Sequence, residues 1–526
     1  IPDKSNIILN NKNIARGDNM YARTYGAATM GVEGLLIDVE VDAANGLPGF
    51  EMVGMPDTLV REAKERVRTA IRNSGIMMHQ ERVTVNLAPA AIRKESAGLD
   101  LPIAIALLAA DGIIGSESIG NYAFIGELSL EGRCRPVRGV LPMAIKALDM
   151  GLKGVFISRE NVQEALLVKG LTVYGVENLR QVVEHLQNHQ VLSPACKLEQ
   201  TDCPRSEADF GEVQGQFLAK RAFEVAAAGG HNILLSGAPG SGKTMLARRM
   251  GSILPEMTDR EALEVTRIYS IAGMLKEGEG LIRQRPFRSP HHTVSAAAMI
   301  GGGTIPRPGE VTLSHNGVLF LDELPEFGQR VLECLRQPLE DGTVTVSRAN
   351  ASYRFPSRII LIGAMNPCPC GYYGDKEHIC ECTPSQIRHY TQKLSGPLLD
   401  RFDIQIQVPR VSYQELTAVE KAETSAQIRQ RVMAARERQL YRFQKMDIVS
   451  NGQLTHSMLG QYCPMTAEAE QLLEAAFHQR QMSARSYDRL VKVARTIGDL
   501  AGQDTITAEY IGEALLMRND NIAKAL

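Results

Sequence analysis

The segment GAPGSGKT carries the residue types and the spacing of a phosphate-binding loop. Within residues 231–250 it follows an apolar run typical of a β-strand and precedes a helical pattern, a context that disfavours a glycine-rich turn with a chance lysine. Glycines let backbone N–H groups close around a triphosphate at the positive end of a helix, while the lysine reaches the β- and γ-phosphates and the threonine faces Mg²⁺. The predicted ATP-binding residues are Gly237, Ala238, Pro239, Gly240, Ser241, Gly242, Lys243 and Thr244.

A second motif, GVLFLDEL at 317–324, is an apolar strand that ends in two carboxylates. In a nucleotide hydrolase Asp322 would hold Mg²⁺, and Glu323 would orient and deprotonate the attacking water. Either carboxylate alone could instead begin a helix as its N-cap. The next predicted strand, 358–367, ends near Asn366, whose amide could polarise the same water or sense the γ-phosphate.

Downstream, SGPLLDRFD at 395–403 places Arg401 after an apolar turn. An arginine there is either a finger inserted into a neighbouring subunit's nucleotide or one partner of a surface salt bridge.

The segment CPCGYYGDKEHICEC at 368–382 holds four thiols in two C-x-C pairs. Cys368, Cys370, Cys380 and Cys382 could bind Zn²⁺ tetrahedrally, with reduced surface thiols as the alternative. The zinc would be structural, because four thiolates leave no open coordination position.

The elements that must position these residues form several domains, since 526 residues exceed one core. Residues 1–19 are polar and unperiodic, which predicts a disordered leader with Met20 a plausible true start. From 20 to 190 strands and helices mix: 34–43, 82–89 and 154–158 are predicted strands, 57–75 and 100–112 helices, and 122–137 a hairpin. A linker at 191–212 precedes a nucleotide domain at 213–410 and helices at 411–526, among them 413–446 and 486–502.

Charge and cysteine content limit the partners and the compartment. The net charge is −2, so nucleic acid could bind only through local patches. No apolar run is long enough for a membrane span, which predicts no membrane partner. Nine cysteines, without a secretory pattern ahead of them, indicate reduced thiols in a cytoplasm.

Taken in order, GAPGSGKT, RSPHHT, GGGTIPRPGEVTLSHNGVLFLDE, MNPCPCG, LSGPLLDRFD and SARSYDRLVKVARTIGDLA resemble the magnesium-chelatase-like AAA+ ATPases. More narrowly, the chain resembles the bacterial YifB/ComM branch, the competence protein M family, from about Met20 to its end. The resemblance implies a homo-hexameric ring with ATP and Mg²⁺ at each subunit interface. It also implies these roles: Lys243 and Thr244 as the Walker A pair, Asp322 and Glu323 as the Walker B pair, Asn366 as sensor 1, Arg401 as the arginine finger and Arg485 as sensor 2.

The resemblance further implies an α/β multidomain fold. It comprises a Lon-protease-like (ribosomal S5 domain 2-like) α+β domain at 20–190, a P-loop AAA+ αβα core at 213–410 containing the loop 368–382, and a C-terminal helical lid at 411–526. Ser96 can be aligned with the Lon nucleophile, but Leu141 stands where Lon has its lysine base, and Lys146 falls a helical turn later. We therefore expect no peptidase activity.

The segment TVTVSRANASYRFPSR at 343–358 has three arginines and no carboxylate, which predicts a strand pair with a cationic tip. In the related helicases a hairpin at this place projects into the ring's pore. The resemblance therefore implies that Arg348, and secondarily Arg354, contacts DNA phosphates there. A hairpin at a subunit interface is the alternative. In RSPHHT, His291 and His292 are interpreted as structural hydrogen-bonding residues.

The function that follows is an ATP-driven DNA motor acting on single-stranded and branched DNA through the pore. Helicase or branch-migration work in homologous recombination and natural transformation is the expected task. Two alternatives stay open: a magnesium-chelatase-type ATPase subunit that drives a metal-inserting partner, and a protein-remodelling ATPase.

Overall fold

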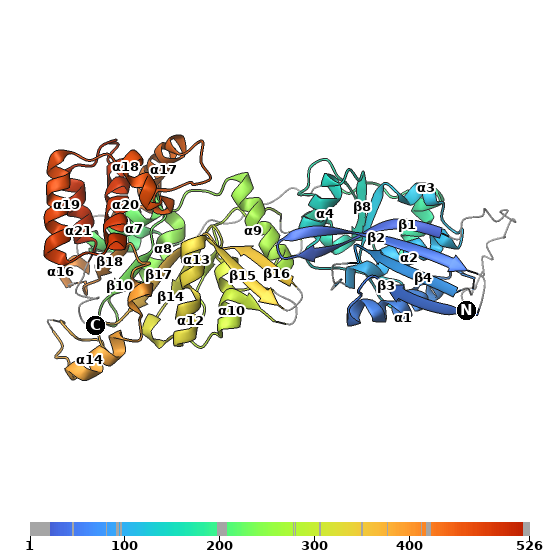
Figure 1. Ribbon diagram of the computed structural model, residues 1–526, viewed down its shortest axis with the longest axis horizontal. Coiled ribbons are helices and arrows are strands. Elements are labelled where there is room, and N and C mark those ends of the chain that lie inside the picture. Colours follow the sequence, from blue (N-terminus) through green and yellow to red (C-terminus); the bar gives the residue numbers. More distant parts are fainter. Residues whose placement is uncertain are drawn as a thin grey trace. The chain divides into compact units, whose positions relative to one another are not determined.

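The computed structural model describes residues 21–44, 47–79, 82–90, 94, 97–196, 208–276, 278, 280–303, 307–348, 351–375, 377–411, 413–416 and 422–518. The predicted leader and Ser96 lie outside these residues, as does the middle of the predicted linker. The chain divides into two compact units, 1–200 with 269–281, and 201–268 with 282–526 (Figure 1).

The first unit is built on a mixed seven-stranded sheet in the order β3-β4-β2-β1-β5-β8-β9. Strand β2 is antiparallel to both β1 and β4, and the other neighbours are parallel. In β2 the side chains of Ile37, Val39 and Val41 are buried at alternate positions, as a sheet with one face on the core requires. The strands are β1 (Tyr21–Met30), β2 (Glu33–Ala44), β3 (Gly49–Val53), β4 (Arg82–Ala88), β5 (Tyr122–Ile125), β8 (Gly154–Ser158) and β9 (Thr172–Val176).

The helices of this unit agree with the sequence pattern. Helix α1 begins after Asp57, whose carboxylate accepts a hydrogen bond from Val60 N at 3.0 Å, so the predicted N-cap is confirmed. Every residue of α2 is buried, including Asp100, which is paired with Arg66 of α1. The helices are α1 (Thr58–Asn73), η1 (Ala97–Leu99), α2 (Asp100–Ala110), α3 (Ser116–Ile119), α4 (Val140–Asp149), η2 (Arg159–Asn161), α5 (Val162–Ala165) and α6 (Leu179–Leu186).

The hairpin predicted at 122–137 is confirmed only for its second part, 127–135, and is wrong for 122–125. Strand β5 joins the large sheet in parallel with β1 and β8, and only the short strands β6 (Glu127–Leu128) and β7 (Cys134–Arg135) pair antiparallel. Gly126 separates the two strands, and its amide donates to Gly98 O at 3.0 Å. The hydrophobic pattern of 122–125 suits a strand buried on both faces as well as a hairpin arm, so the pattern alone does not choose its neighbours.

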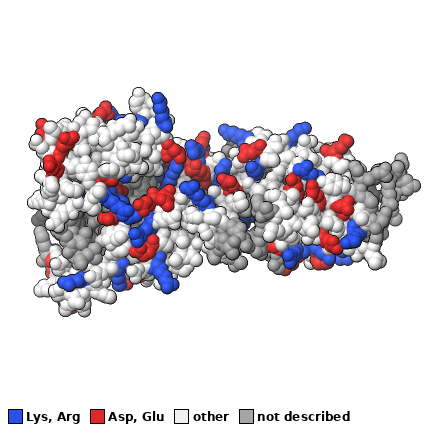
Figure 2. Space-filling model, viewed as in Figure 1, with Lys and Arg blue, Asp and Glu red and all other residues white. Residues whose placement is uncertain are grey.

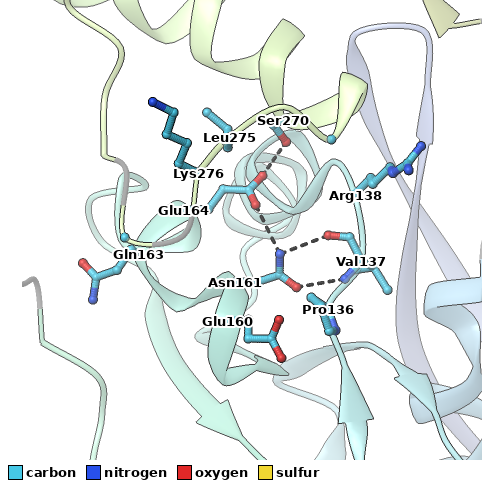
Figure 3. A pocket seen from close by; sticks show the side chains of 12 residues that line it. Pro136, Val137, Arg138, Glu160, Asn161, Gln163, Glu164, Ser270, Leu275 and Lys276 are labelled. Carbon is cyan, nitrogen blue, oxygen red and sulfur yellow. Dashed lines mark hydrogen bonds between the residues drawn. The ribbon is translucent and has the colours of Figure 1, made fainter.

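Residues 269–281 belong to the first unit although they follow the start of helix α9 (Asp259–Ala272). Ser270 donates a hydrogen bond to the buried carboxylate of Glu164, which also accepts from Asn161 Nδ2 at 3.4 Å (Figure 3). The same carboxylate accepts from Leu141 N at 2.8 Å. Burial raises the pKa of Glu164, and these hydrogen bonds oppose the rise. The network borders a cavity of about 320 Å³.

The second unit is built on a parallel five-stranded sheet in the order β11-β14-β17-β10-β18. Its strands β14, β17 and β10 are buried throughout, as expected for a parallel sheet covered on both faces. The strands are β10 (Ile233–Ser236), β11 (Phe287–Arg288), β14 (Val318–Leu321), β17 (Ile360–Met365) and β18 (Ile404–Gln407), with the separate pairs β12 (Gly301–Gly302) with β13 (Arg307–Pro308) and β15 (Thr343–Arg348) with β16 (Ala351–Pro356).

The helices of the second unit precede, connect and follow these strands. Those at its start and between its strands are η3 (Phe210–Glu212), α7 (Phe217–Gly229), α8 (Lys243–Ile253), α10 (Ala296–Ile300), α11 (Glu310–Leu313), η4 (Leu324–Glu326), α12 (Gln329–Cys334), α13 (Arg336–Asp341), α14 (Pro384–Thr391) and α15 (Gly396–Leu399). Those that follow the last strand are α16 (Tyr413–Leu416), α17 (Ser425–Arg442), η5 (Asn451–Gln453), α18 (His456–Tyr462), α19 (Ala467–Arg480), α20 (Ala484–Leu500) and α21 (Ala508–Leu516).

The helical segment predicted at 413–446 is confirmed in part, because the structure has two separate helices there, α16 and α17. Thr424 caps α17 in a reciprocal capping box with Gln427, which fixes a new helix start inside the predicted range. The C-terminal helices gather into one bundle (Figure 1), in which α20 packs against α7 and α17.

In the described part of the chain, no helix is both long and apolar enough to cross a membrane. Acidic and basic side chains are interspersed over the visible face of each unit (Figure 2), in keeping with the net charge of −2. Any binding of a polyanion therefore has to use a local feature.

Candidate active site

The site lies at the carboxyl edge of the parallel sheet in the second unit, where β10, β14 and β17 end in GAPGSGKT, Asp322 and Asn366. Gly240 and Gly242 have φ values of 77° and 86°, a backbone conformation that glycine adopts without strain. A Cβ at Gly237 would lie 2.4 Å from Val408 O, so a larger residue would push the loop off β18. The loop is thus shaped by its glycines and leads directly into helix α8.

Lys243 is buried and faces the loop that precedes it. Its Nζ donates to Gly237 O at 2.7 Å, to Ala238 O at 3.0 Å and to Asn366 Oδ1 at 3.2 Å. Burial lowers the pKa of Lys243, and the nearby Asp322 carboxylate opposes that shift. Two strand ends that are far apart in the sequence therefore meet at one ammonium group.

Thr244 and Asp322 form the second junction of the site. Thr244 Oγ1 donates to Asp322 Oδ2 at 2.7 Å, and the other carboxylate oxygen accepts from Glu323 N at 3.0 Å. A hydroxyl and a carboxylate are the oxygen ligands that Mg²⁺ takes beside substrate phosphates. The donor set therefore fits Mg²⁺ held jointly with a nucleotide.

Glu323 follows with φ 52°, and its side chain is 60% exposed. Its carboxylate lies 3.7 Å from His292 Nδ1, and the His292 ring lies against that of His291, with centroids 4.0 Å apart and the planes tilted by 35°. The sequence interpretation made both histidines structural and missed that His292 faces the predicted base. The one indication of this contact was position. His292 closely follows β11 and Glu323 closely follows β14, and these two strands are parallel neighbours in the sheet.

The two predicted arginines converge on Glu340 of α13. Arg401 is 4% exposed, hydrogen-bonds Glu340 Oε2 and donates to Pro397 O at 2.8 Å. Arg485, in the first turn of α20, has Nη2 3.6 Å from Glu340 Oε1. Among the described contacts neither arginine bonds the phosphate-binding loop of its own chain. Sequence reasoning did not single out Glu340.

A residue ahead of the loop, Gln216, also supports it. Gln216 has φ 51°, and its Nε2 donates to Ser241 O at 2.6 Å. The residues on either side of it line a cavity of about 540 Å³, which Ile428 of α17 also borders. This cavity has the size of a small-molecule pocket, and its lining includes the two neighbours in sequence of Gln216, the residue that bonds the loop.

The strand pair predicted at 343–358 is confirmed as β15 and β16, paired antiparallel. Its buried face consists of Val344, Val346 and Phe355. Arg354 is exposed on the opposite face and has no side-chain hydrogen bond or ion pair among the described residues, whereas Arg358 pairs with Asp447 at 3.3 Å. The structure gives the backbone of Arg348, but its side chain lies outside the described part.

The four predicted metal ligands lie together. The Sγ atoms of Cys368, Cys370, Cys380 and Cys382 are all within 4.8 Å of one another, and Cys368 is buried. Sequence spacing predicted this cluster, although 371–379 separates its two halves.

Comparison with known proteins identifies the family of this chain. Residues 209–416 match the family "Magnesium chelatase, subunit ChlI", 39–161 match "Subunit ChlI of Mg-chelatase", and 422–518 match "Magnesium chelatase, subunit ChlI C-terminal". The competence protein ComM of Haemophilus influenzae is 42% identical over 499 residues, which are 94% of this chain and 96% of ComM. YifB of Escherichia coli is 43% identical over 494 residues, 93% of this chain and 96% of YifB. A protein of Mycobacterium tuberculosis is 39% identical over 497 residues, 94% and 98% of the two chains. The resemblance stated from the motifs is confirmed: this chain belongs to the ComM/YifB family, whose domains are those of magnesium-chelatase-like AAA+ ATPases.

Proposed function

We propose that this protein is a ring-forming ATPase that couples ATP hydrolysis to movement along DNA, with helicase or branch-migration work in recombination and natural transformation as its task. The observation that carries the hydrolysis part is the meeting of three strand ends, with Lys243 on Asn366 and Thr244 on Asp322. The competence protein among its relatives supports DNA as the partner.

The residues divide the work as follows. Backbone N–H groups of 237–244 and the Lys243 ammonium bind the phosphates, and the base occupies the cavity beside Gln216. Thr244 and Asp322 would hold Mg²⁺, which neutralises charge developing on the phosphates. Glu323 takes the proton of the attacking water, and Asn366 orients that water.

Arg401 serves the nucleotide of a neighbouring subunit in a homo-hexamer, and Arg485 closes the lid over the nucleotide. Both roles require the arginines to exchange Glu340 for phosphate when the ring assembles, because each contacts Glu340 within its own chain. The pair of Arg485 with Glu340 is exposed on both sides and therefore weak. Arg401 is buried and also donates to Pro397 O, so its release requires a local rearrangement around α15.

The hairpin β15–β16 is the proposed grip on DNA. The exposed Arg354 supports this, because a cation that has no partner among the described residues is available to a phosphate. Arg348, at the end of β15, is the other proposed contact. The Lon-like identity of the first unit, and a role for it in ring assembly or DNA handling without peptidase activity, are part of this proposal. So is a cytoplasmic location, which the free state of the eight described cysteines supports.

A magnesium-chelatase-type subunit is the second candidate, favoured by the family that 209–416 match. Such a subunit would use the same nucleotide site to drive a separate metal-inserting partner, and its hydrolysis would not respond to DNA.

The test is the steady-state ATPase rate alone, with single-stranded DNA and with a three-stranded junction, using Lys243→Ala as the blank. We expect stimulation by DNA that Arg354→Ala reduces while basal hydrolysis persists. Hydrolysis that is indifferent to every DNA would overturn the DNA motor and leave the chelatase-type function.

A further inference from the structure

The four-cysteine loop lies against the nucleotide site, and its thiols are spaced as metal ligands. Cys368 Sγ lies 3.3 Å from Cys370 Sγ and 3.7 Å from Cys380 Sγ, and Cys370 Sγ lies 3.6 Å from Cys380 Sγ. Zn–S bonds of about 2.3 Å at tetrahedral angles place thiolates about 3.8 Å apart. A disulfide would require about 2.05 Å. The spacing of these three thiols is therefore close to that of ligands around one ion, and Cys382 Sγ lies within 4.8 Å of each of them.

The chemistry of the donor atoms limits which metal ion can bind. Four cysteine sulfurs within 4.8 Å of one another favour Zn²⁺, or iron in a thiolate site, over Mg²⁺ or Ca²⁺, which take oxygen ligands. The set is closed, since all four positions are filled by protein, so the ion would be structural. The segment between β17 and α14 contains no helix or strand among its described residues. Local contacts such as the hydrogen bonds that Asp375 accepts from Glu377 N and His378 N hold it instead.

The same loop contacts the phosphate-binding loop. Gly371 has φ 88°, and a Cβ there would lie 2.6 Å from Pro239 Cδ, so only glycine fits this approach. Arg410, three residues after β18, donates to Pro239 O at 3.4 Å. Its guanidinium lies 5.5 Å from the ring centroid of Tyr372, a residue of the loop.

The loop also continues the strand that carries Asn366. Cys368 stands two positions after Asn366, and its Sγ accepts from Tyr373 N at 3.3 Å. Any constraint on Cys368 is therefore transmitted over two residues to the amide that contacts Lys243.

We propose that Cys368, Cys370, Cys380 and Cys382 bind one Zn²⁺, and that the zinc-loaded loop holds Pro239 and Asn366 in the geometry that binds nucleotide. The coupling to nucleotide rests on the proposed ATP site, whereas the metal site stands on the thiol geometry alone. Loss of the metal releases the loop from the phosphate-binding loop and weakens nucleotide binding without unfolding the sheet.

The first experiment counts metal in the full-length protein, purified without chelator, by elemental analysis. We expect about one zinc per chain, lost in Cys380→Ser and in Cys382→Ser and retained in the matched control Cys196→Ser, an exposed cysteine outside the cluster. Protein refilled with Co²⁺ should show the visible absorption of a tetrahedral cobalt thiolate. Neither zinc nor a cobalt spectrum would overturn the site, and iron in place of zinc would overturn the choice of metal.

The second experiment measures ADP affinity of the zinc-loaded and zinc-depleted full chain, with thermal unfolding recorded in parallel. We expect the Kd for ADP to rise about tenfold on depletion and to recover when Zn²⁺ is restored. Unchanged affinity would overturn the coupling while leaving the metal count in place. Because neither readout uses DNA or hydrolysis, failure of the DNA-motor proposal would be seen separately.

Discussion

Arg401 and Arg485 contact the two carboxylate oxygens of one residue, Glu340: Arg401 hydrogen-bonds Oε2, and Arg485 Nη2 lies 3.6 Å from Oε1. Arg401 follows α15 and Arg485 begins α20, so one side chain of α13 joins the nucleotide domain to the C-terminal helices. Among the described contacts, both arginines are thus bound to Glu340 and not to the phosphate-binding loop of their own chain.

If Arg401 acts on a neighbour's nucleotide, Arg401→Ala should lower ATP turnover by about 10³-fold, as for other arginines supplied in trans. Glu323→Gln should be inactive for a different reason, because it removes the proposed base. Mixing the two inactive variants should restore part of the activity, since an interface between them can combine an intact Glu323 with an intact Arg401. The measurement is ATP turnover against mixing ratio.

Mixtures that stay inactive, from variants shown by light scattering to co-assemble, would mean that Arg401 serves only its own chain. The salt bridge to Glu340 would then be its whole role.

His292 should position Glu323, because the two side chains approach to 3.7 Å while Glu323 is otherwise 60% exposed. We expect His292→Ala to lower turnover about tenfold, less than the ~10²-fold or more lost with the base itself. Nucleotide affinity should be unchanged, so kcat falls and KM does not. His291→Ala is the matched control, since His291 bonds Thr293 at 2.9 Å. Equal effects of the two variants would mean that the histidine pair is merely structural.

Arg354 should contribute a phosphate contact that salt weakens. Arg354→Ala is expected to reduce the slope of log K for DNA against log salt concentration by about 1, because one fewer counterion is released. Fluorescence anisotropy with labelled single-stranded DNA from low to physiological salt measures the slope. Arg358→Ala serves as the control, since Arg358 already pairs with Asp447. A slope unchanged in Arg354→Ala would remove this residue from the DNA interface.

Glu164 should make the first unit less stable as the pH rises. Burial raises the pKa of Glu164 above the usual 4.5. Well below pH 4.5 the carboxyl is neutral in both the folded and the unfolded chain, so it does not lower the free energy of unfolding there. As the pH rises from there to the folded pKa, the unfolded chain loses this proton first, and stability falls. Glu164→Gln should flatten that part of the curve of unfolding temperature against pH.

Glu160→Gln is the control for that curve, because Glu160 is exposed at the rim of the same cavity as Arg138 and Lys276. Parallel curves for Glu164→Gln and the parent protein would show that the buried carboxyl does not titrate in this range.

Much of the fold was predictable because its signals are local. The phosphate-binding loop requires glycines at fixed offsets, the strands of the parallel sheet are continuous apolar runs, and helix α1 is preceded by its capping Asp57. The family could be identified from the sequence for the same reason, because its motifs are short and occur in a fixed order along the chain. The four cysteines were likewise visible as pairs, although only folding brings Cys368 to within 3.7 Å of Cys380.

What the sequence could not provide is pairing between distant segments. The parallel neighbours of β5, the break between α16 and α17, and the inclusion of 269–281 in the first unit depend on packing that no local pattern encodes. The partners of single polar side chains belong to the same class. The contacts of Glu340 with two arginines, and of His292 with Glu323, depend on where the strands and helices end in space. Only the tertiary structure decided these contacts.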